Sequence, residues 1–170
     1  MASASSDVVL RFQELVAQLP EWLQPGGVAL AGAVPFVEGE GAAAIGIVGG
    51  LHPVVAAAAG IVGNVLAVLV VVLVSVRTRE AVVTHARGRG VALDDAPSPR
   101  RQKFDRAFAR YGVAGVCLLG PLLIPTHFTA AALAASGVHR VRILAWQAVA
   151  IVLWTVAVSL VVTGVLAIRA

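Results

Sequence analysis

The sequence predicts an all-α integral membrane protein with two inverted repeats, each a re-entrant helical hairpin followed by a transmembrane helix, and an N-terminal amphipathic helix. Three observations predict this class. The 170 residues are 59% hydrophobic and only 13% charged, with a mean hydropathy of +0.90, whereas a soluble domain carries about 25% charged residues. Two uncharged apolar segments are long enough to cross a bilayer. Two further apolar segments contain prolines and glycines that interrupt a helix.

Residues 1–25 predict an amphipathic helix. Apolar side chains recur at helical spacing between Val8 and Leu23, and polar side chains fall between them. The segment is too polar to span a membrane, and it lacks the basic start and short apolar core of a signal peptide. We expect it to lie in the membrane interface, with Trp22 as an anchor.

Each predicted repeat combines an interrupted segment with an uninterrupted one. The hairpins are expected at 26–50 and 112–138, and the spans at 54–76 and 143–168. The residues expected to break the hairpins are Pro35, Gly39, Gly41, Pro121 and Pro125. Because broken helices at membrane depth must be buried in protein or line a polar cavity, these breaks are candidate sites.

The charge distribution predicts the orientation. Segment 77–110 carries nine of the 13 basic residues and four acidic ones, so we expect it to be a cytoplasmic loop of a multi-pass protein in the cytoplasmic membrane. Arg140 and Arg142 stay on the same side only if segment 112–138 turns back. Residues 1–25 give no reason for a cytoplasmic start, so segment 26–50 is also expected to turn back. The sequence pI of 10.6 therefore reports orientation and not nucleic-acid binding.

The two hairpin segments resemble each other in sequence. "GAVPFVEGEGAAAIGIVGG" begins at Gly32 and "GPLLIPTHFTAAALAASGV" begins at Gly120. A constant offset also pairs Gly49 with Gly137. One hairpin would enter from outside and the other from inside, which is the inverted repeat of secondary transporters. In such folds the site lies near the midplane, where the broken helices meet.

Two groups of residues in the breaks are candidates for proton coupling. Glu38 and Glu40 lie in an apolar stretch, and carboxylates at bilayer depth often mark a proton path. Burial and a second carboxylate both raise a carboxyl pKa. The alternative is a solvated turn at the headgroup level. His127 lies beside Thr126 and Thr129, and its ordinary pKa near 6.5 suits proton exchange; the alternative is a histidine that only satisfies a broken-helix carbonyl.

Candidate substrate-binding residues are Thr126, Thr129, Asn64, Arg106 and Arg110. For Asn64, a hydrogen bond between closely packed helices is the favoured alternative, because Gly60 and Gly63 flank it. The two arginines would meet lipid phosphates, or would serve only as orientation charges. The four histidines and Cys117 show no metal-ligand spacing, and no catalytic motif is present. We therefore expect no enzyme activity, no metal and no cofactor.

Two motifs stand at the predicted breaks. The first is "EGEGAAAIGIVGG…AAAAGIVGN", with Glu38, Gly41, Ala42, Gly63 and Asn64. The second is "FARYGVAGVCLLGPLLIPTHFTAAALAA", with Tyr111, Gly112, Pro121, Pro125, Thr129 and Ala130. At these residues the sequence resembles the small multidrug export protein family, which is similar to the wider DedA group of membrane proteins. Glu40 replaces the basic residue expected after the glutamate, and Thr126-His127-Phe128 replaces the expected glycines. The resemblance covers residues 30–165 and implies paired re-entrant hairpins and proton-coupled transport, including movement of lipid-linked phosphates.

The sequence thus predicts a small proton-coupled transporter for a lipid-linked phosphate or an amphipathic drug-like compound. Its expected partners are membrane lipids and a second copy of the chain in a homodimer. The alternative is a non-transporting membrane scaffold or assembly factor, in which the polar residues of the breaks serve packing alone.

Overall fold

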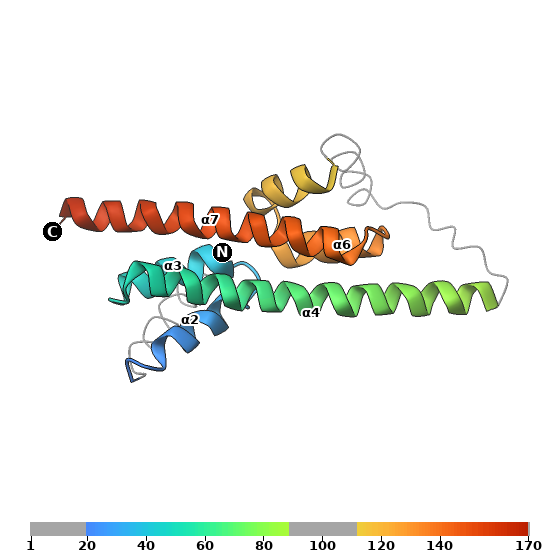
Figure 1. Cartoon of the computed structure of the whole chain (residues 1–170), viewed down its shortest axis with the longest axis horizontal. Coiled ribbons are helices and arrows are strands. Elements are labelled where there is room, and N and C mark those ends of the chain that lie inside the picture. Colours follow the sequence, from blue (N-terminus) through green and yellow to red (C-terminus); the bar gives the residue numbers. More distant parts are fainter. Residues whose placement is uncertain (1–19, 89–111, 170) are drawn as a thin grey trace, which may run out of the picture. The chain divides into compact units, whose positions relative to one another are not determined.

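The computed structural model describes residues 20–88 and 112–169, and within these ranges the ordered elements are all helices (Figure 1). In chain order they are α2 (Gln24–Gly32), α3 (Glu38–Val48), α4 (Pro53–Gly88), the 3-10 turn η1 (Gly120–Leu122), α6 (Thr126–Ala135) and α7 (Arg140–Arg169). Residues 112–119 are helical and run into η1. The amphipathic helix expected over 1–25 lies almost wholly outside the described residues.

Both uncharged segments form long apolar helices, as the sequence predicts. The stretches Pro53–His85 and Arg140–Ile168 have mean hydropathies of 2.7 and 2.5 in their most apolar windows, and both are long enough to cross a membrane. Only 28% and 17% of those windows are buried, unlike the core helices of a soluble protein. The chain therefore has two helices with the length and composition of membrane spans.

Helix α4 does not end where the sequence predicts. The expected span stops at residue 76, but α4 continues through residues 77–88, the first part of the expected basic loop. Arginine, glutamate and alanine are good helix formers, so the loss of hydrophobicity at Arg77 does not stop the helix. At 1.5 Å per residue the 36 residues of α4 extend for about 54 Å, well beyond a ~30 Å hydrocarbon core. Residues 89–110 of the expected loop lie outside the described residues.

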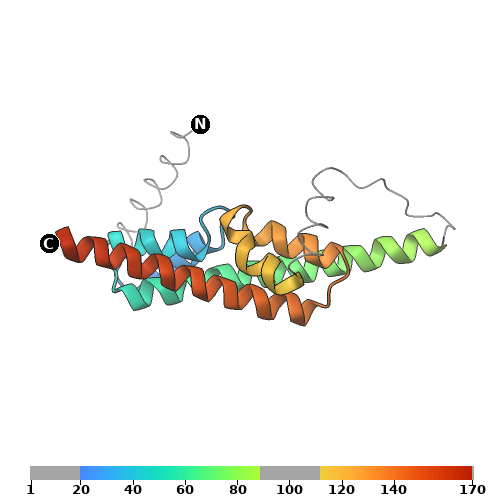
Figure 2. The same cartoon turned by 90° about the horizontal axis from the view of Figure 1, so that it is seen from above.

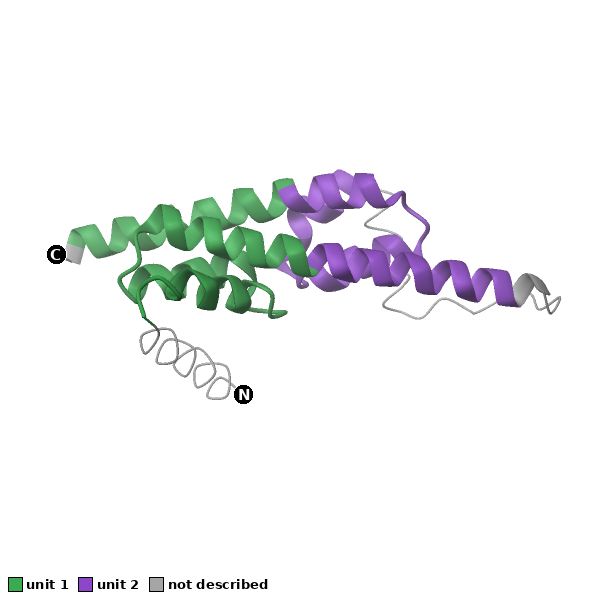
Figure 3. Ribbon diagram, turned by 60° about the horizontal axis from the view of Figure 1, so that its bottom comes forward, with its two compact units in different colours: residues 1–67, 149–170 green, residues 68–148 purple. Residues whose placement is uncertain are grey.

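The chain divides into two compact units, and each long helix contributes to both (Figure 3). Unit 1 comprises residues 1–67 and 149–170, and unit 2 comprises residues 68–148. In unit 1, α2 and α3 lie against the first part of α4 (Figures 1 and 2). In unit 2, residues 112–119, η1 and α6 accompany the second part of α4 and the start of α7.

Glycines allow the helices of unit 1 to approach closely. A Cβ added at Gly32 would lie 2.6 Å from the Gly60 carbonyl oxygen, and one added at Gly60 would lie 2.5 Å from the Gly39 carbonyl oxygen. A Cβ at Gly63 would overlap the backbone of Ala29. Because no side chain fits at these positions, α4 packs on both α2 and α3 through backbone contacts, which is the small-residue packing of membrane helices. Val28, Ala31 and Ala42 form the buried core between α2 and α3.

The turns after α3 and α6 have the same hydrogen-bond pattern. After α3, Gly50 has a φ of 94°, its N–H donates to Ile47, and the Leu51 N–H donates to Gly46. After α6, the corresponding residues are Gly137 (φ 83°) and Val138, which donate to Ala134 and Leu133. Each turn is a Schellman motif, in which glycine adopts the left-handed conformation at little cost.

The two turns align in a register that differs by one residue from the constant offset of the sequence match. The constant offset pairs Gly137 with Gly49, but Gly50 is the residue that shares its conformation. The register shifts by one because α3 has 11 residues and α6 has 10. The shifted register then pairs His52 with His139, and the carbonyl of each histidine accepts the first hydrogen bonds of the long helix that follows.

Several polar residues of the described helices are buried, whereas large apolar residues are exposed along the two long helices. The buried polar side chains are Glu38, Asn64, Thr126, His127, Thr129, Gln147, Thr155 and Ser159. On α4 alone the exposed apolar side chains include Val62, Leu66, Val70 and Val74. A soluble monomer rarely exposes a continuous apolar surface of this kind, so the surface of these helices matches a hydrocarbon solvent.

Candidate functional site

The break between α2 and α3 brings Glu38 into the interior. Residues 33–37 form turns, and both Phe36 (φ 73°) and Glu38 (φ 55°) adopt the left-handed conformation. This conformation costs a non-glycine residue about 1–2 kcal/mol. It separates the two side chains, because Phe36 is 80% exposed whereas Glu38 is only 4% exposed. Strained residues of this kind cluster at functional sites, where the surrounding structure holds them.

Two of the predicted helix breakers do not make this break. Pro35 lies within it, but Gly39 and Gly41 belong to the first turn of α3. Gly39 instead provides a close contact, because a Cβ there would lie 2.5 Å from Thr155 Oγ1. A Cβ at Gly41 would make only an ordinary contact with Val37. The left-handed positions are occupied by Phe36 and Glu38, so the turn does not depend on the conformational freedom of these two glycines.

Glu40 differs from Glu38 in its surroundings. It lies one residue beyond Gly39 in the first turn of α3 and is half-buried. Of the two carboxyl groups, the buried one is therefore that of Glu38.

Helix α7 presents a row of hydroxyl groups within unit 1. Thr155, Ser159 and Thr163 are four residues apart and therefore lie on one face of the helix; we call them the hydroxyl row. Ser159 Oγ donates to the Thr155 carbonyl (2.7 Å), and Thr163 Oγ1 donates to the Ser159 carbonyl (2.8 Å). Thr155 Oγ1 is buried against Gly39 and has no hydrogen-bond partner among the described residues. The row thus begins beside the residue that follows Glu38.

Asn64 extends this polar interior on α4. It is fully buried and lies one helical turn beyond Gly60, on the face of α4 that contacts Gly39. Unit 1 therefore combines a carboxyl, an amide and hydroxyl groups inside a shell of apolar side chains. Such groups can exchange protons or bind a polar part of a substrate.

The second break, in unit 2, buries the other predicted group. Pro125 precedes α6 in an extended conformation (φ −51°, ψ 143°), and Thr126, His127 and Thr129 are all at least 95% buried. Gln147 Nε2 of α7 donates to the Thr126 carbonyl (3.4 Å), and Thr129 Oγ1 donates to the Pro125 carbonyl (3.4 Å). Pro121 lies in η1, so both prolines interrupt the helix where the sequence predicts.

The predicted site residues therefore fall into two groups. Glu38, Glu40 and Asn64 belong to unit 1, whereas Thr126, His127 and Thr129 belong to unit 2. Arg106 and Arg110 lie outside the described residues. Within residues 20–88 and 112–169, no group of three His, Cys, Asp or Glu side chains could hold a metal ion.

The sequence predicts only an uncharged span for the segment that forms α7, and it does not identify the hydroxyl row as a polar feature. The signal that would have found it is the four-residue spacing of Thr155, Ser159 and Thr163 in an otherwise apolar helix. Gly60 was read as a flank of Asn64, although it contacts the backbone of α3.

Comparisons of the chain with protein-family models, with curated proteins and with solved structures found no match. The resemblance to the small multidrug export family therefore depends on the short motifs around Glu38 and Pro121 alone. The structural features that bear on function are the buried polar groups of the two units.

Proposed function

We propose that the protein is a small proton-coupled transporter of the cytoplasmic membrane, moving a lipid-linked phosphate or an amphipathic drug-like compound. The observation that carries this proposal is the burial of Glu38 at a strained helix break, beside helices whose outer surface is apolar. A carboxyl group in such surroundings is costly to ionise, and natural proteins retain it mainly for ion or proton movement. The exposed apolar surface of α4 and α7 supports placement in a bilayer.

The lengths of the short helices support re-entrant hairpins. With 9 and 11 residues, α2 and α3 extend for about 14 and 17 Å, which is close to half of a ~30 Å hydrocarbon core. Residues 112–119 and α6 repeat this order of short helix, break and short helix before α7. Together with the basic residues near the end of α4 and the start of α7, this order favours two hairpin-plus-span repeats of opposite orientation.

Within this proposal Glu38 takes up and releases the proton. Glu40, in the first turn of the same helix, and His127, in the other repeat, are the further candidates for proton coupling. The amide of Asn64 and the hydroxyl groups of Thr126 and Thr129 would bind the polar part of the substrate. Thr155 joins the predicted residues as the hydroxyl group nearest to the start of α3. The resemblance to the DedA group agrees with an amphipathic, phosphate-bearing substrate.

The direct test is transport by the purified protein. Liposomes containing the wild-type chain and a pH gradient should move a fluorescent lipid phosphate or an amphipathic cation faster than protein-free liposomes. Collapse of the gradient with an ionophore should remove the difference. If neither probe moves faster than in protein-free liposomes, the scaffold alternative replaces the transporter.

The re-entrant topology predicts that both ends of the first hairpin face the same side. In a Cys117→Ala background, single cysteines at Gly26 and His52 should react with a membrane-impermeant reagent from outside intact cells. Both positions are exposed, and neither has the positive φ that makes Gly50 unsuitable for this substitution. A cysteine at Arg79, on the basic part of α4, should react only after the membrane is opened. Labelling of positions 26 and 52 from opposite sides would remove the hairpin and the inverted repeat.

A further inference from the structure

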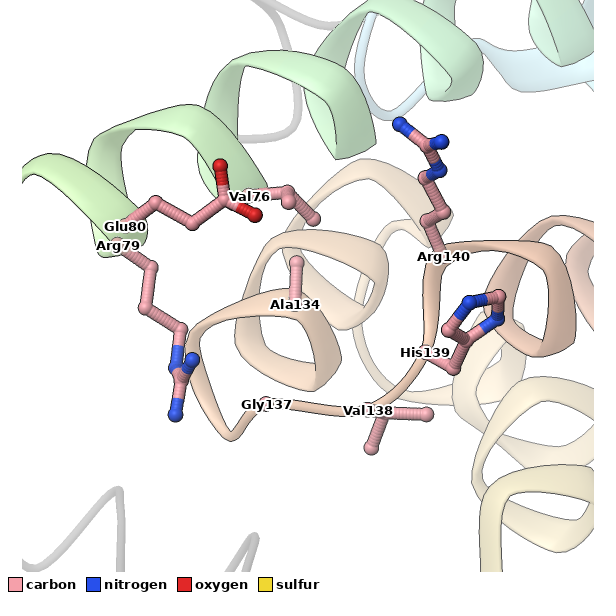
Figure 4. Close-up of a pocket in the computed structure, with 8 residues that line it drawn as sticks. All are labelled: Val76, Arg79, Glu80, Ala134, Gly137, Val138, His139 and Arg140. Carbon is pink, nitrogen blue, oxygen red and sulfur yellow. The ribbon is translucent and has the colours of Figure 1, made fainter.

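A pocket of about 340 Å³ lies in unit 2 between the second part of α4 and the turn from α6 to α7 (Figure 4). Val76, Ala134 and Val138 form its apolar wall. Its charged and titratable lining comprises Arg79, Glu80, His139 and Arg140; we call this cavity the arginine pocket. None of these residues was assigned to the proposed transport site.

Arg79 is held in place at the edge of this pocket. Its Nε donates to the Ala135 carbonyl at the end of α6 (3.1 Å). Its guanidinium also lies against Gly137, where an added Cβ would be 2.8 Å from Nη2. A guanidinium has five N–H donors in a rigid fork, and this hydrogen bond engages one of them. The Schellman turn thus orients an arginine whose planar head suits the oxygens of a phosphate group.

The opposite wall of the pocket is the N-terminal end of α7. The His139 carbonyl accepts hydrogen bonds from the N–H groups of Arg142 (3.0 Å) and Ile143 (3.2 Å), so His139 caps this helix. Arg140 is the first residue of a 30-residue helix, whose N-terminal end attracts an anion. Arg79 and Arg140 outnumber Glu80, so the lining carries a net positive charge even with neutral His139.

The position of the pocket along the two helices indicates which kind of anion it suits. Val76 is the last residue of the uncharged stretch of α4, and Ile143 begins the uncharged stretch of α7. The pocket therefore lies where both helices change from apolar to charged, which is the headgroup level of a bilayer. An apolar wall next to two arginines suits the phosphate and glycerol of a lipid better than a free anion.

We propose that the arginine pocket binds the phosphate group of an anionic phospholipid, with Arg140 at the start of α7 contacting the phosphate oxygens. Arg79, whose guanidinium lies at the other end of the pocket (Figure 4), adds positive charge and donors for the rest of the headgroup. The apolar side chains Val76 and Val138 would contact the glycerol and the upper acyl chain. This inference requires the membrane placement of the proposed function but not transport. Binding of a lipid here would tie the end of α4 to the start of α7.

The test is lipid binding by the full-length protein, delipidated in a non-ionic detergent and measured by native mass spectrometry. Phosphatidylglycerol should bind saturably, whereas phosphatidylcholine, whose choline neutralises the phosphate, should bind about tenfold more weakly or worse. Inorganic phosphate should not compete at millimolar concentrations. Competition by inorganic phosphate as strong as that by the lipid would overturn the lipid assignment. Because no gradient is involved, failure here is distinct from failure of transport.

Four single substitutions distinguish lipid binding in the pocket from a general attraction of anionic lipids to basic residues. Arg140→Gln and Arg79→Gln should each weaken phosphatidylglycerol binding about tenfold. Arg77→Gln and Arg142→Gln, exposed arginines on the same helices that do not line the pocket, should leave it within about twofold. Arg140→Gln is the decisive variant, since Arg79 also bonds to the end of α6; circular dichroism checks that both fold. Equal weakening by all four substitutions would overturn the pocket.

Discussion

Replacing Glu38 with glutamine is expected to reduce proton-driven transport to the rate of protein-free liposomes. Glutamine keeps the size and the hydrogen-bonding capacity of the side chain but cannot take up or release a proton. The left-handed backbone at this position is equally strained for both residues, so the substitution changes the chemistry with little change in the fold. The measurement is substrate flux in liposomes across a series of imposed pH gradients.

Glu40→Gln is the matched control for this prediction. Glu40 lies on the same helix two residues away, but it is only half-buried. We expect Glu40→Gln to retain a measurable rate of transport, because Glu40 is less buried than Glu38 and is not the group that exchanges the proton in this proposal. Glu38→Asp, which keeps a carboxyl group, should retain part of the flux. Full activity of Glu38→Gln would place the proton step elsewhere.

The sequence located both helix breaks because proline and apolar composition act locally. Pro35, Pro121 and Pro125 all lie in or beside a break in the structure. Proline removes a backbone donor wherever it occurs, so its effect does not depend on distant residues. For Glu38 the sequence leaves two alternatives open, burial or a solvated turn at the membrane surface, and in the structure its side chain is buried.

The glycines were harder to interpret because glycine has two separate uses. It permits a left-handed backbone, and it also lets another backbone approach closely. Gly39 was assigned to the first use but serves the second, against Thr155 and Gly60. Only the positions of the partner helices distinguish these uses. Gly50, which does have a positive φ, was missed because its neighbour Gly49 fits the constant sequence offset.

Helix α4 is longer than the predicted span because a membrane boundary and a helix end are different events. The first is set by the transfer of side chains from hydrocarbon to water, and it falls near Arg77. The second is set by backbone hydrogen bonding and helix propensity, and it falls near Gly88. The arginine pocket forms only because Arg79 lies on a helix. The sequence predicts a loop at this position and therefore does not predict the pocket.

Gly60→Ala and Gly164→Ala should change stability in opposite directions. In an exposed helix, replacing glycine with alanine stabilises by about 1 kcal/mol. Gly164 of α7 has open space around it, so this gain should be realised there. At Gly60 the new methyl group would lie 2.5 Å from the Gly39 carbonyl oxygen, and such overpacking costs about 1–3 kcal/mol.

Thermal unfolding in one detergent measures both variants. The Gly60→Ala midpoint should fall and the Gly164→Ala midpoint should rise, although the two substitutions add the same methyl group to long apolar helices. Helix propensity favours alanine equally in both variants, so a difference between their unfolding midpoints reports the close approach of α3 and α4. The new methyl group would press on Gly39, which directly follows Glu38, so Gly60→Ala should disturb the surroundings of Glu38 and lower transport as well. Equal stabilisation of both variants would show that α4 and α3 are farther apart than described, and the polar interior of unit 1 would lose its basis.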